Sequence, residues 1–90
     1  MKRIREYEEK EKFLLDLEYE FVKEFIMLRK ENGLTQEQLA KEANIIRETV
    51  AKIETQVVSP TISTIIKILG SIGYTLRITE IEEVIDETNK

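Results

Sequence analysis

Cysteine and histidine are both absent from the 90 residues of this chain. Their absence excludes a disulfide scaffold, a zinc site built from cysteine and histidine, and histidine-based acid–base catalysis. The chain also lacks a long apolar run and begins with charged residues, so we expect no signal peptide, no membrane span and a cytoplasmic location. Because no nucleophile–base pair, phosphate-binding loop or metal cluster is visible, we expect neither an enzyme nor a cofactor.

The composition that remains is sufficient for one small folded domain. Hydrophobic residues make up 41% of the chain and charged residues 36%, so the chain has enough apolar material for a core and should not be disordered as a whole. A core of this size is marginal by itself, and small domains often gain stability by forming dimers.

The formal net charge is −4, which is unusual for a protein that binds nucleic acid. Residues 1–28 hold 6 basic and 8 acidic side chains, residues 29–67 hold 6 and 5, and residues 68–90 hold 2 and 5. The middle of the chain is therefore slightly basic, and the acidic residues are concentrated towards the ends. Because salt screens charges beyond roughly 8 Å, a locally basic DNA-binding face is compatible with overall acidity, and the acidic ends suit a basic protein partner.

The most informative segment is residues 34–54, LTQEQLAKEANIIRETVAKIE. Its apolar residues recur so that two short helices would share one buried face, with a tight break at Asn44-Ile45-Ile46. This is the pattern of a helix-turn-helix, in which the second helix enters the major groove of DNA. An ordinary helical hairpin packed in a bundle is the alternative interpretation.

Capping and turn residues locate the two helices of this motif. Thr35 is a good N-cap for the first helix, and Gln38 three residues later completes a capping box. Asn44 stands at the turn, where a left-handed backbone is useful and asparagine tolerates it. In the second helix, Val50 and Ile53 face the core. The side chains that remain for the outer face are Arg47, Glu48, Thr49 and Lys52.

A helical extension precedes the motif. Apolar residues at Ile4, Tyr7 and 13–15 indicate a first helix, and Asp16 is a candidate N-cap for a second; alternatively, one helix runs through without a break. The helix should end near Asn32-Gly33, where glycine favours a left-handed stop. The apolar stripe of this region consists of Leu17, Phe21, Phe25 and Leu28.

In the C-terminal part, the spacing of apolar residues changes from that of a helix to the alternation of a strand. Ser59-Pro60-Thr61 signals the start of that helix, and Gly73 should end it. Tyr74, Leu76 and Ile78 then alternate with polar residues, which is typical of a half-buried strand. Because a lone strand cannot satisfy its own backbone, we predict that it pairs with the same strand of a second copy; a short edge lying on its own subunit is the alternative. The core stripe expected for the last helix is Ile62, Ile65, Ile66 and Leu69.

These residues resemble the Xre/Cro-type helix-turn-helix family, to which phage repressors belong. The similarity covers residues 28–72 and rests on the Leu-Thr-Gln opening, the Leu39-Ala40 pair and the Val50…Ile53-Glu54 ending. The helical extension ahead of LRKENGLTQ, followed by SPTISTIIKILGSIGYTLRI, is similar to HigA-type antitoxins of bacterial type II toxin–antitoxin systems.

The resemblance implies an all-α, lambda-repressor-like bundle of about five helices. Residues 1–28 would form the N-terminal helical extension packed on the core, and residues 29–73 the Xre-type helix-turn-helix domain. Residues 74–90 would contribute the short C-terminal dimerising strand, with Tyr74, Leu76 and Ile78, and an acidic tail.

The resemblance also implies roles for individual side chains. Gln36 would hold a phosphate, Thr49 a phosphate or a thymine methyl, and Arg47, Glu48 and Lys52 would read bases. In the major groove, arginine bonds a guanine edge and glutamate accepts from a cytosine amino group. A solvated surface is the alternative for these charged side chains. The predicted DNA-binding set is Thr35, Gln36, Arg47, Glu48, Thr49, Lys52, Thr55 and Gln56.

The sequence departs from the family pattern at two places. Ile46 stands where the family usually has a capping serine or threonine, and losing that cap costs the second helix about 1 kcal/mol. Gln56 and Val57 replace the common Gly-Lys after this helix, which removes a residue suited to a left-handed backbone and one phosphate contact.

The function that the resemblance implies is that of an antitoxin. The chain would bind double-stranded operator DNA as a homodimer and repress its own operon. It would also neutralise a cognate RelE/HigB-like toxin, a small basic ribonuclease that cleaves mRNA. The alternatives are a stand-alone Xre-type repressor and a protein-interaction module that has lost DNA binding.

Overall fold

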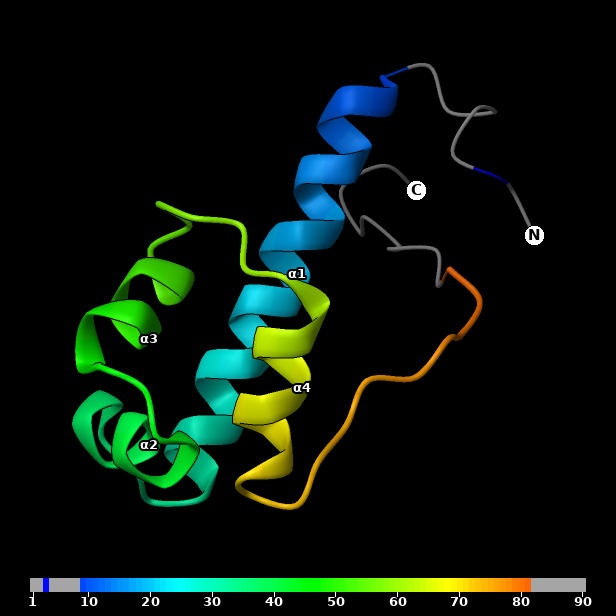
Figure 1. The fold of residues 1–90 in the computed structure, drawn as a ribbon. Helices are drawn as coiled ribbons and strands as arrows, with labels where there is room; N and C mark the ends of the chain where they lie inside the picture. The colour runs from blue at the N-terminus through cyan, green and yellow to red at the C-terminus, as the bar shows by residue number, and fades with distance from the viewer. Residues whose placement is uncertain (1–2, 4–8, 82–90) are drawn as a thin grey trace.

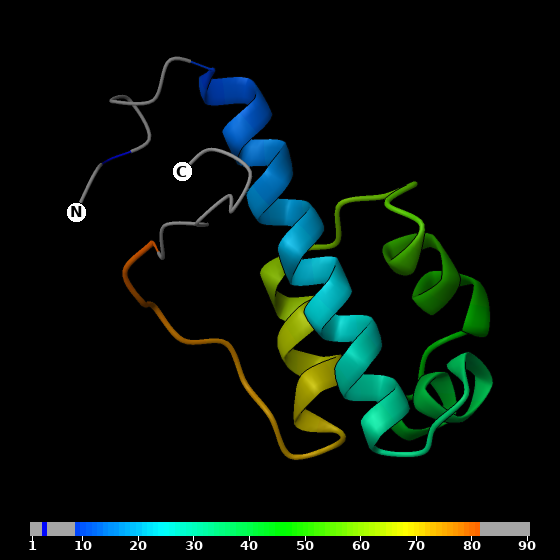
Figure 2. The ribbon, with the colours of Figure 1, turned by 180° about the vertical axis from the view of Figure 1, so that it is seen from behind.

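The computed structural model describes residue 3 and residues 9–81, and this part of the chain folds into four α-helices. They are α1 (Lys10–Glu31), α2 (Gln36–Ala43), α3 (Arg47–Glu54) and α4 (Ile62–Gly70). Figure 1 shows α4 alongside the second half of α1, with α2 and α3 on the other side, and Figure 2 shows the same arrangement from behind. None of the described helices is long and apolar enough to cross a membrane.

The long helix α1 runs without a break through Asp16, so the unbroken alternative is correct for residues 10–31. Asp16 is not an N-cap: its carboxylate accepts from Lys12 Nζ at 3.1 Å, one helical turn earlier. The helix ends where the sequence predicts, at Asn32, and Gly33 follows with a φ of +70°. Ile4 and Tyr7 lie outside the described residues. The expected count of about five helices is therefore wrong for the described part, because the break that would separate the first two does not occur.

The core forms where α2, α3 and α4 meet the second half of α1. Phe25 supplies the contact from α1, and Phe21 and Leu28 pack against the core at its edge. Val50 and Ile53 are fully buried, as their spacing predicts. The buried core residues are Phe25, Leu39, Ala40, Ala43, Val50, Ile53, Ile65, Ile68 and Leu69.

The core stripe predicted for α4 is only half correct. Ile65 and Leu69 are buried, but Ile62 and Ile66 are 71% and 44% exposed, and Ile68 takes the place of Ile66 in the core. Ile66 lies about 100° around the helix from Ile65, which carries it off the buried arc. Ile62 begins the helix, beyond the end of the core.

The predicted C-terminal strand is absent from the described residues. Residues 74–81 leave α4 without regular secondary structure. The backbone N–H of Tyr74 still bonds to the carbonyl of Leu69 at 2.9 Å and closes the end of the helix. A strand exists only where a neighbour satisfies its backbone groups, and the single chain offers no such neighbour in its described part.

Candidate nucleic-acid interface

The start of α2 is held by the capping box that the sequence predicts. Thr35 Oγ1 accepts from the backbone N–H of Gln38 at 3.1 Å, and Gln38 Oε1 accepts from the backbone N–H of Thr35 at 2.8 Å. Because Thr35 Oγ1 serves the cap, this residue positions α2 and places its neighbour Gln36, which is partly buried, in the first turn.

The turn between α2 and α3 depends on Asn44, whose φ of 56° and ψ of 47° are left-handed, as predicted. The next N–H, that of Ile45, bonds to the Ala40 carbonyl at 2.9 Å. The Ile45 side chain packs against the core and so anchors the turn to the rest of the domain. The segment from α2 to α3 is thus a helix-turn-helix, in which a tight left-handed turn joins two short helices.

The helix α3 presents a polar outer face because its apolar residues point inward. Val50 and Ile53 are buried, whereas Arg47, Glu48 and Lys52 are exposed and Thr49 is partly exposed. These four outer residues belong to the predicted DNA-binding set. The side chains carry a net charge of +1 from two cations and one anion, so the face is locally positive on an acidic chain.

A buried ion pair, which the sequence reasoning missed, joins the end of α3 to the end of α1. Arg29 Nε donates to Glu54 Oε2 at 2.7 Å and Arg29 Nη2 to Glu54 Oε1 at 3.0 Å. The third guanidinium nitrogen, Nη1, donates to the Leu34 carbonyl at 2.8 Å. The side chains of Arg29 and Glu54 are only 11% and 5% exposed. Such a bidentate pair has one geometry, so it fixes α3 relative to α1.

The same carboxylate orients the predicted phosphate-binding residue. Gln36 Nε2 donates to Glu54 Oε1 at 3.0 Å, which turns the amide oxygen of Gln36 outward. That oxygen accepts from Arg47 Nη1 at 3.3 Å. A continuous chain of hydrogen bonds therefore runs from Arg29 through Glu54 and Gln36 to Arg47. The only sequence signal was the pair of an arginine and a glutamate 25 residues apart, which points to no contact without the fold.

Two charged side chains at the start of α3 also pair with each other. Arg47 Nη2 lies 3.8 Å from Glu48 Oε1, and both side chains are at least half exposed. An exposed pair of this kind is worth at most about 1 kcal/mol, so it does not prevent Arg47 from reaching another partner.

Thr55 and Gln56 follow α3 at the opposite end from Arg47. Thr55 Oγ1 donates to the Ala51 carbonyl at 2.9 Å, so its hydroxyl proton is used inside the helix end. Gln56 adopts a φ of 58°, the left-handed conformation for which the family pattern has glycine. The structure thus brings Gln36, Arg47, Glu48, Thr49 and Lys52 to one region and leaves Thr55 and Gln56 at its edge.

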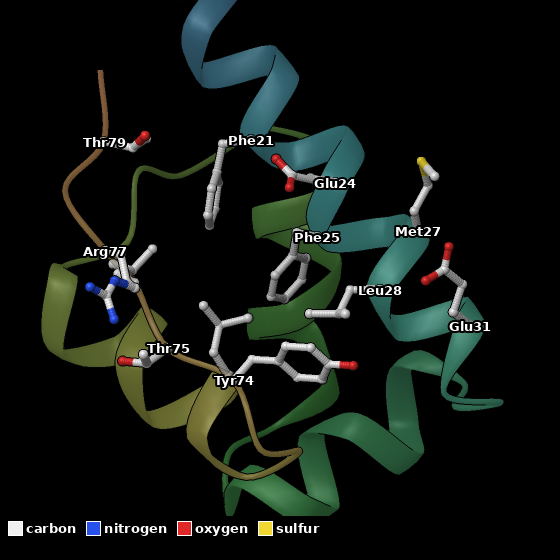
Figure 3. A pocket seen from close by; sticks show the side chains of 12 residues that line it. Phe21, Glu24, Phe25, Met27, Leu28, Glu31, Tyr74, Thr75, Arg77 and Thr79 are labelled. Carbon is white, nitrogen blue, oxygen red and sulfur yellow. The ribbon is translucent and has the colours of Figure 1, made fainter. Parts of the chain in front are cut away.

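The predicted dimerisation residues lie on the other side of α1, along the extended segment after α4. Figure 3 shows Phe21, Phe25 and Leu28 of α1 facing the segment that carries Tyr74, with Glu24 and Glu31 on the rim. Tyr74 and Leu76 line this hollow and are 46% and 37% exposed. Ile78 does not line the hollow and is fully exposed.

The fold and the polar outer face of α3 define this chain as a helix-turn-helix protein of the Xre type. A family model described as Helix-turn-helix matches residues 26–78, and the chain belongs to this family. No curated protein matches the chain. Among solved structures, a toxin–antitoxin module from Streptococcus pneumoniae is similar, with 28% identity and a TM-score of 0.65. The match covers 87% of this chain and 86% of that chain.

Proposed function

We propose that this chain is the antitoxin of a type II toxin–antitoxin pair, of the HigA type, and that it represses its own operon. The observation that carries the proposal is the outer face of α3, where Arg47 is held by an oriented Gln36 and Lys52 is exposed. The similarity to a toxin–antitoxin module over most of both chains supports the pairing with a toxin. The protein acts by binding and catalyses no reaction.

DNA binding follows from the geometry of two copies. In a homodimer, two α3 helices related by a two-fold axis enter successive major grooves about 34 Å apart. Arg47 and Lys52 contact guanine edges or phosphates, and Glu48 accepts from a cytosine amino group. Gln36 and the nearby N-terminal amides of α2 hold a phosphate, which fixes the register of α3 on the duplex.

The dimer forms through residues 74–78. The side chains of Tyr74, Leu76 and Ile78 alternate along an extended segment whose exposed backbone has no strand partner in the described part of the chain. Antiparallel pairing of two such segments satisfies the backbone groups of both copies.

Toxin binding uses the first half of α1. This part of the helix projects beyond α3 and α4 (Figure 1) and exposes Leu14, Leu15 and Tyr19 at 50% or more. Acidic side chains accompany these apolar ones on the same helical stretch, namely Glu11, Asp16, Glu18 and Glu20. Apolar side chains among acids suit a small basic ribonuclease of the RelE/HigB class.

The variant Lys52→Ala tests the base-reading role of α3. If Lys52 contacts a base, the variant loses about 1–3 kcal/mol of operator binding, and if it contacts a phosphate, the salt slope of log K falls by about one. Fluorescence anisotropy with the operator measures both quantities. Lys67→Ala, which removes an exposed lysine from α4, is the matched control and should bind as the wild type does. Equal operator affinity of Lys52→Ala and the wild type over the salt range would contradict this role.

The toxin partner is tested by co-expressing this chain with a small basic protein encoded next to its gene, if the neighbouring DNA holds such a reading frame. The toxin alone should arrest growth, and co-expression of this chain should restore growth and yield a co-purifying complex. Operator binding without a toxic neighbour would favour a stand-alone Xre-type repressor.

A protein-interaction module without DNA binding is the second candidate. The pairing of Glu48 with Arg47 and the net charge of −4 favour it. It predicts no salt-dependent binding to any DNA sequence.

A further inference from the structure

An exposed isoleucine, Ile46, occupies the N-cap position of α3, immediately before its first residue. The helices α2 and α4 begin with threonine caps, Thr35 and Thr61, whose side chains accept from the backbone of the first turn. At the corresponding position of α3 stands Ile46, with extended backbone at φ −85° and ψ 150° and no side-chain cap. Isoleucine is among the least favourable N-cap residues, so this position forgoes helix stability that serine or threonine would supply.

Ile46 does not serve the core instead. Its neighbour Ile45 packs against the core, whereas the Ile46 side chain is 65% exposed. Two adjacent isoleucines thus divide into one that holds the turn and one that projects into solvent. Neither local helix stability nor packing accounts for an isoleucine at position 46.

The place of Ile46 in the helix-turn-helix explains why an exposed isoleucine stands at this position. The side chain lies immediately before Arg47 and Glu48 and borders a shallow polar hollow at the N-terminal end of α3, which also involves Lys41 and Asn44. In a helix-turn-helix, the N-terminal residues of the second helix contact base edges in the major groove. The only apolar group that a standard base pair presents there is the C5-methyl group of thymine.

We infer that Ile46 is a specificity-determining residue that packs on the C5-methyl group of one thymine in each operator half-site. This inference rests on the proposed operator binding. Arg47 and Glu48 read hydrogen-bonding edges beside it, and Ile46 adds a purely steric and apolar contact. Cytosine at the same position lacks the methyl group, so Ile46 favours thymine without any hydrogen bond.

Uracil substitution isolates this methyl group, because uracil pairs as thymine does and lacks only the C5-methyl. Each thymine of the selected operator is replaced by uracil in turn, and the Kd of the full-length protein is measured. For the wild type, one position per half-site should weaken binding about fourfold, as expected for one buried methyl-sized group.

Three variants assign the effect to the side chain. Ile46→Ser should bind the thymine and uracil operators equally, and Ile46→Val should retain the discrimination. Val57→Ser removes an apolar side chain of similar exposure, 68%, after the other end of α3 and should behave as the wild type does. Ile46→Ser should also melt no lower than the wild type, because serine restores a cap.

Two results would overturn the inference and leave the repressor proposal intact. In the first, the wild type binds every uracil-substituted operator as tightly as the thymine operator. In the second, Ile46→Ser distinguishes thymine from uracil as strongly as the wild type does. A folded wild type that binds no unmodified DNA sequence specifically would overturn both.

Discussion

At the scale of single residues, Glu54 connects the stability of the domain with its DNA-facing side. Its carboxylate accepts from Arg29 and Gln36, and its side chain is 5% exposed. Glu54→Gln leaves the Arg29 guanidinium buried without its counter-charge, and breaking a buried pair in this way costs about 3–5 kcal/mol. Urea denaturation should report this loss in the free energy of unfolding.

The exposed pair of Glu20 and Lys23, 3.4 Å apart, provides the control. Glu20→Gln should change the free energy of unfolding by less than about 1 kcal/mol, because both side chains are half exposed. If the two variants lose the same stability, the buried pair does not hold α3 to α1 as described.

Gln56 carries a second prediction at this scale. A left-handed backbone costs a non-glycine residue about 1–2 kcal/mol. Glycine avoids this strain, but its greater conformational freedom in the unfolded chain cancels about 0.5–1 kcal/mol of the gain. Gln56 has a φ of 58°, so Gln56→Gly should raise the free energy of unfolding by about 0.5–1 kcal/mol. Gly33→Ala should lower the free energy of unfolding, because the added Cβ has open space around it but the φ of +70° strains an alanine. A destabilised Gln56→Gly would show that the glutamine side chain contributes more than the backbone costs.

Local signals in the sequence predicted the individual residues of the motif well. The capping box of Thr35 and Gln38 and the left-handed Asn44 are confirmed because each depends on neighbours within a few residues. The chain of contacts from Arg29 to Arg47 was missed because its members come from three helices. Their proximity is a property of the packed fold and not of any sequence spacing.

At the scale of elements, the segment after α4 and the outer side of α4 are the two exposed apolar surfaces that bear on dimerisation. Ile78 is fully exposed, so Ile78→Glu should leave the folding of one chain unchanged and weaken a dimer that forms through residues 74–78. Sedimentation equilibrium should show a dissociation constant raised at least tenfold. The change reflects a buried apolar contact replaced by like charges facing each other across the two-fold axis.

Ile62→Glu is the matched variant on α4, where the side chain is 71% exposed. It should remain dimeric. If Ile62→Glu dissociates and Ile78→Glu does not, the dimer forms through α4, and the pairing of residues 74–78 is wrong.

The errors at this scale share one cause. Periodicity indicates that a segment has two faces, but it does not say which neighbour covers the apolar face. The predicted stripe on α4 therefore wrongly includes Ile62 and Ile66, which are exposed, and omits Ile68, which is buried. The alternation at 74–78 predicts a strand only where a partner is present, and the described chain has none.

At the scale of the whole molecule, the acidic chain presents one locally basic face. The outer side of α3 carries Arg47 and Lys52, whereas the first half of α1 carries acidic side chains beside the exposed Leu14, Leu15 and Tyr19. We therefore expect two partners of opposite charge to bind different surfaces of the domain, the duplex at α3 and a basic protein at the first half of α1. Salt should weaken the DNA complex steeply, because each neutralised phosphate releases counterions.

The most direct test is a salt titration of the wild-type protein against DNA from upstream of its own gene. We expect specific binding at least 10³-fold tighter than to scrambled DNA of the same length, with log K falling linearly as log salt rises. A folded dimer that binds neither DNA at low salt, or both equally at every salt concentration, would contradict this expectation.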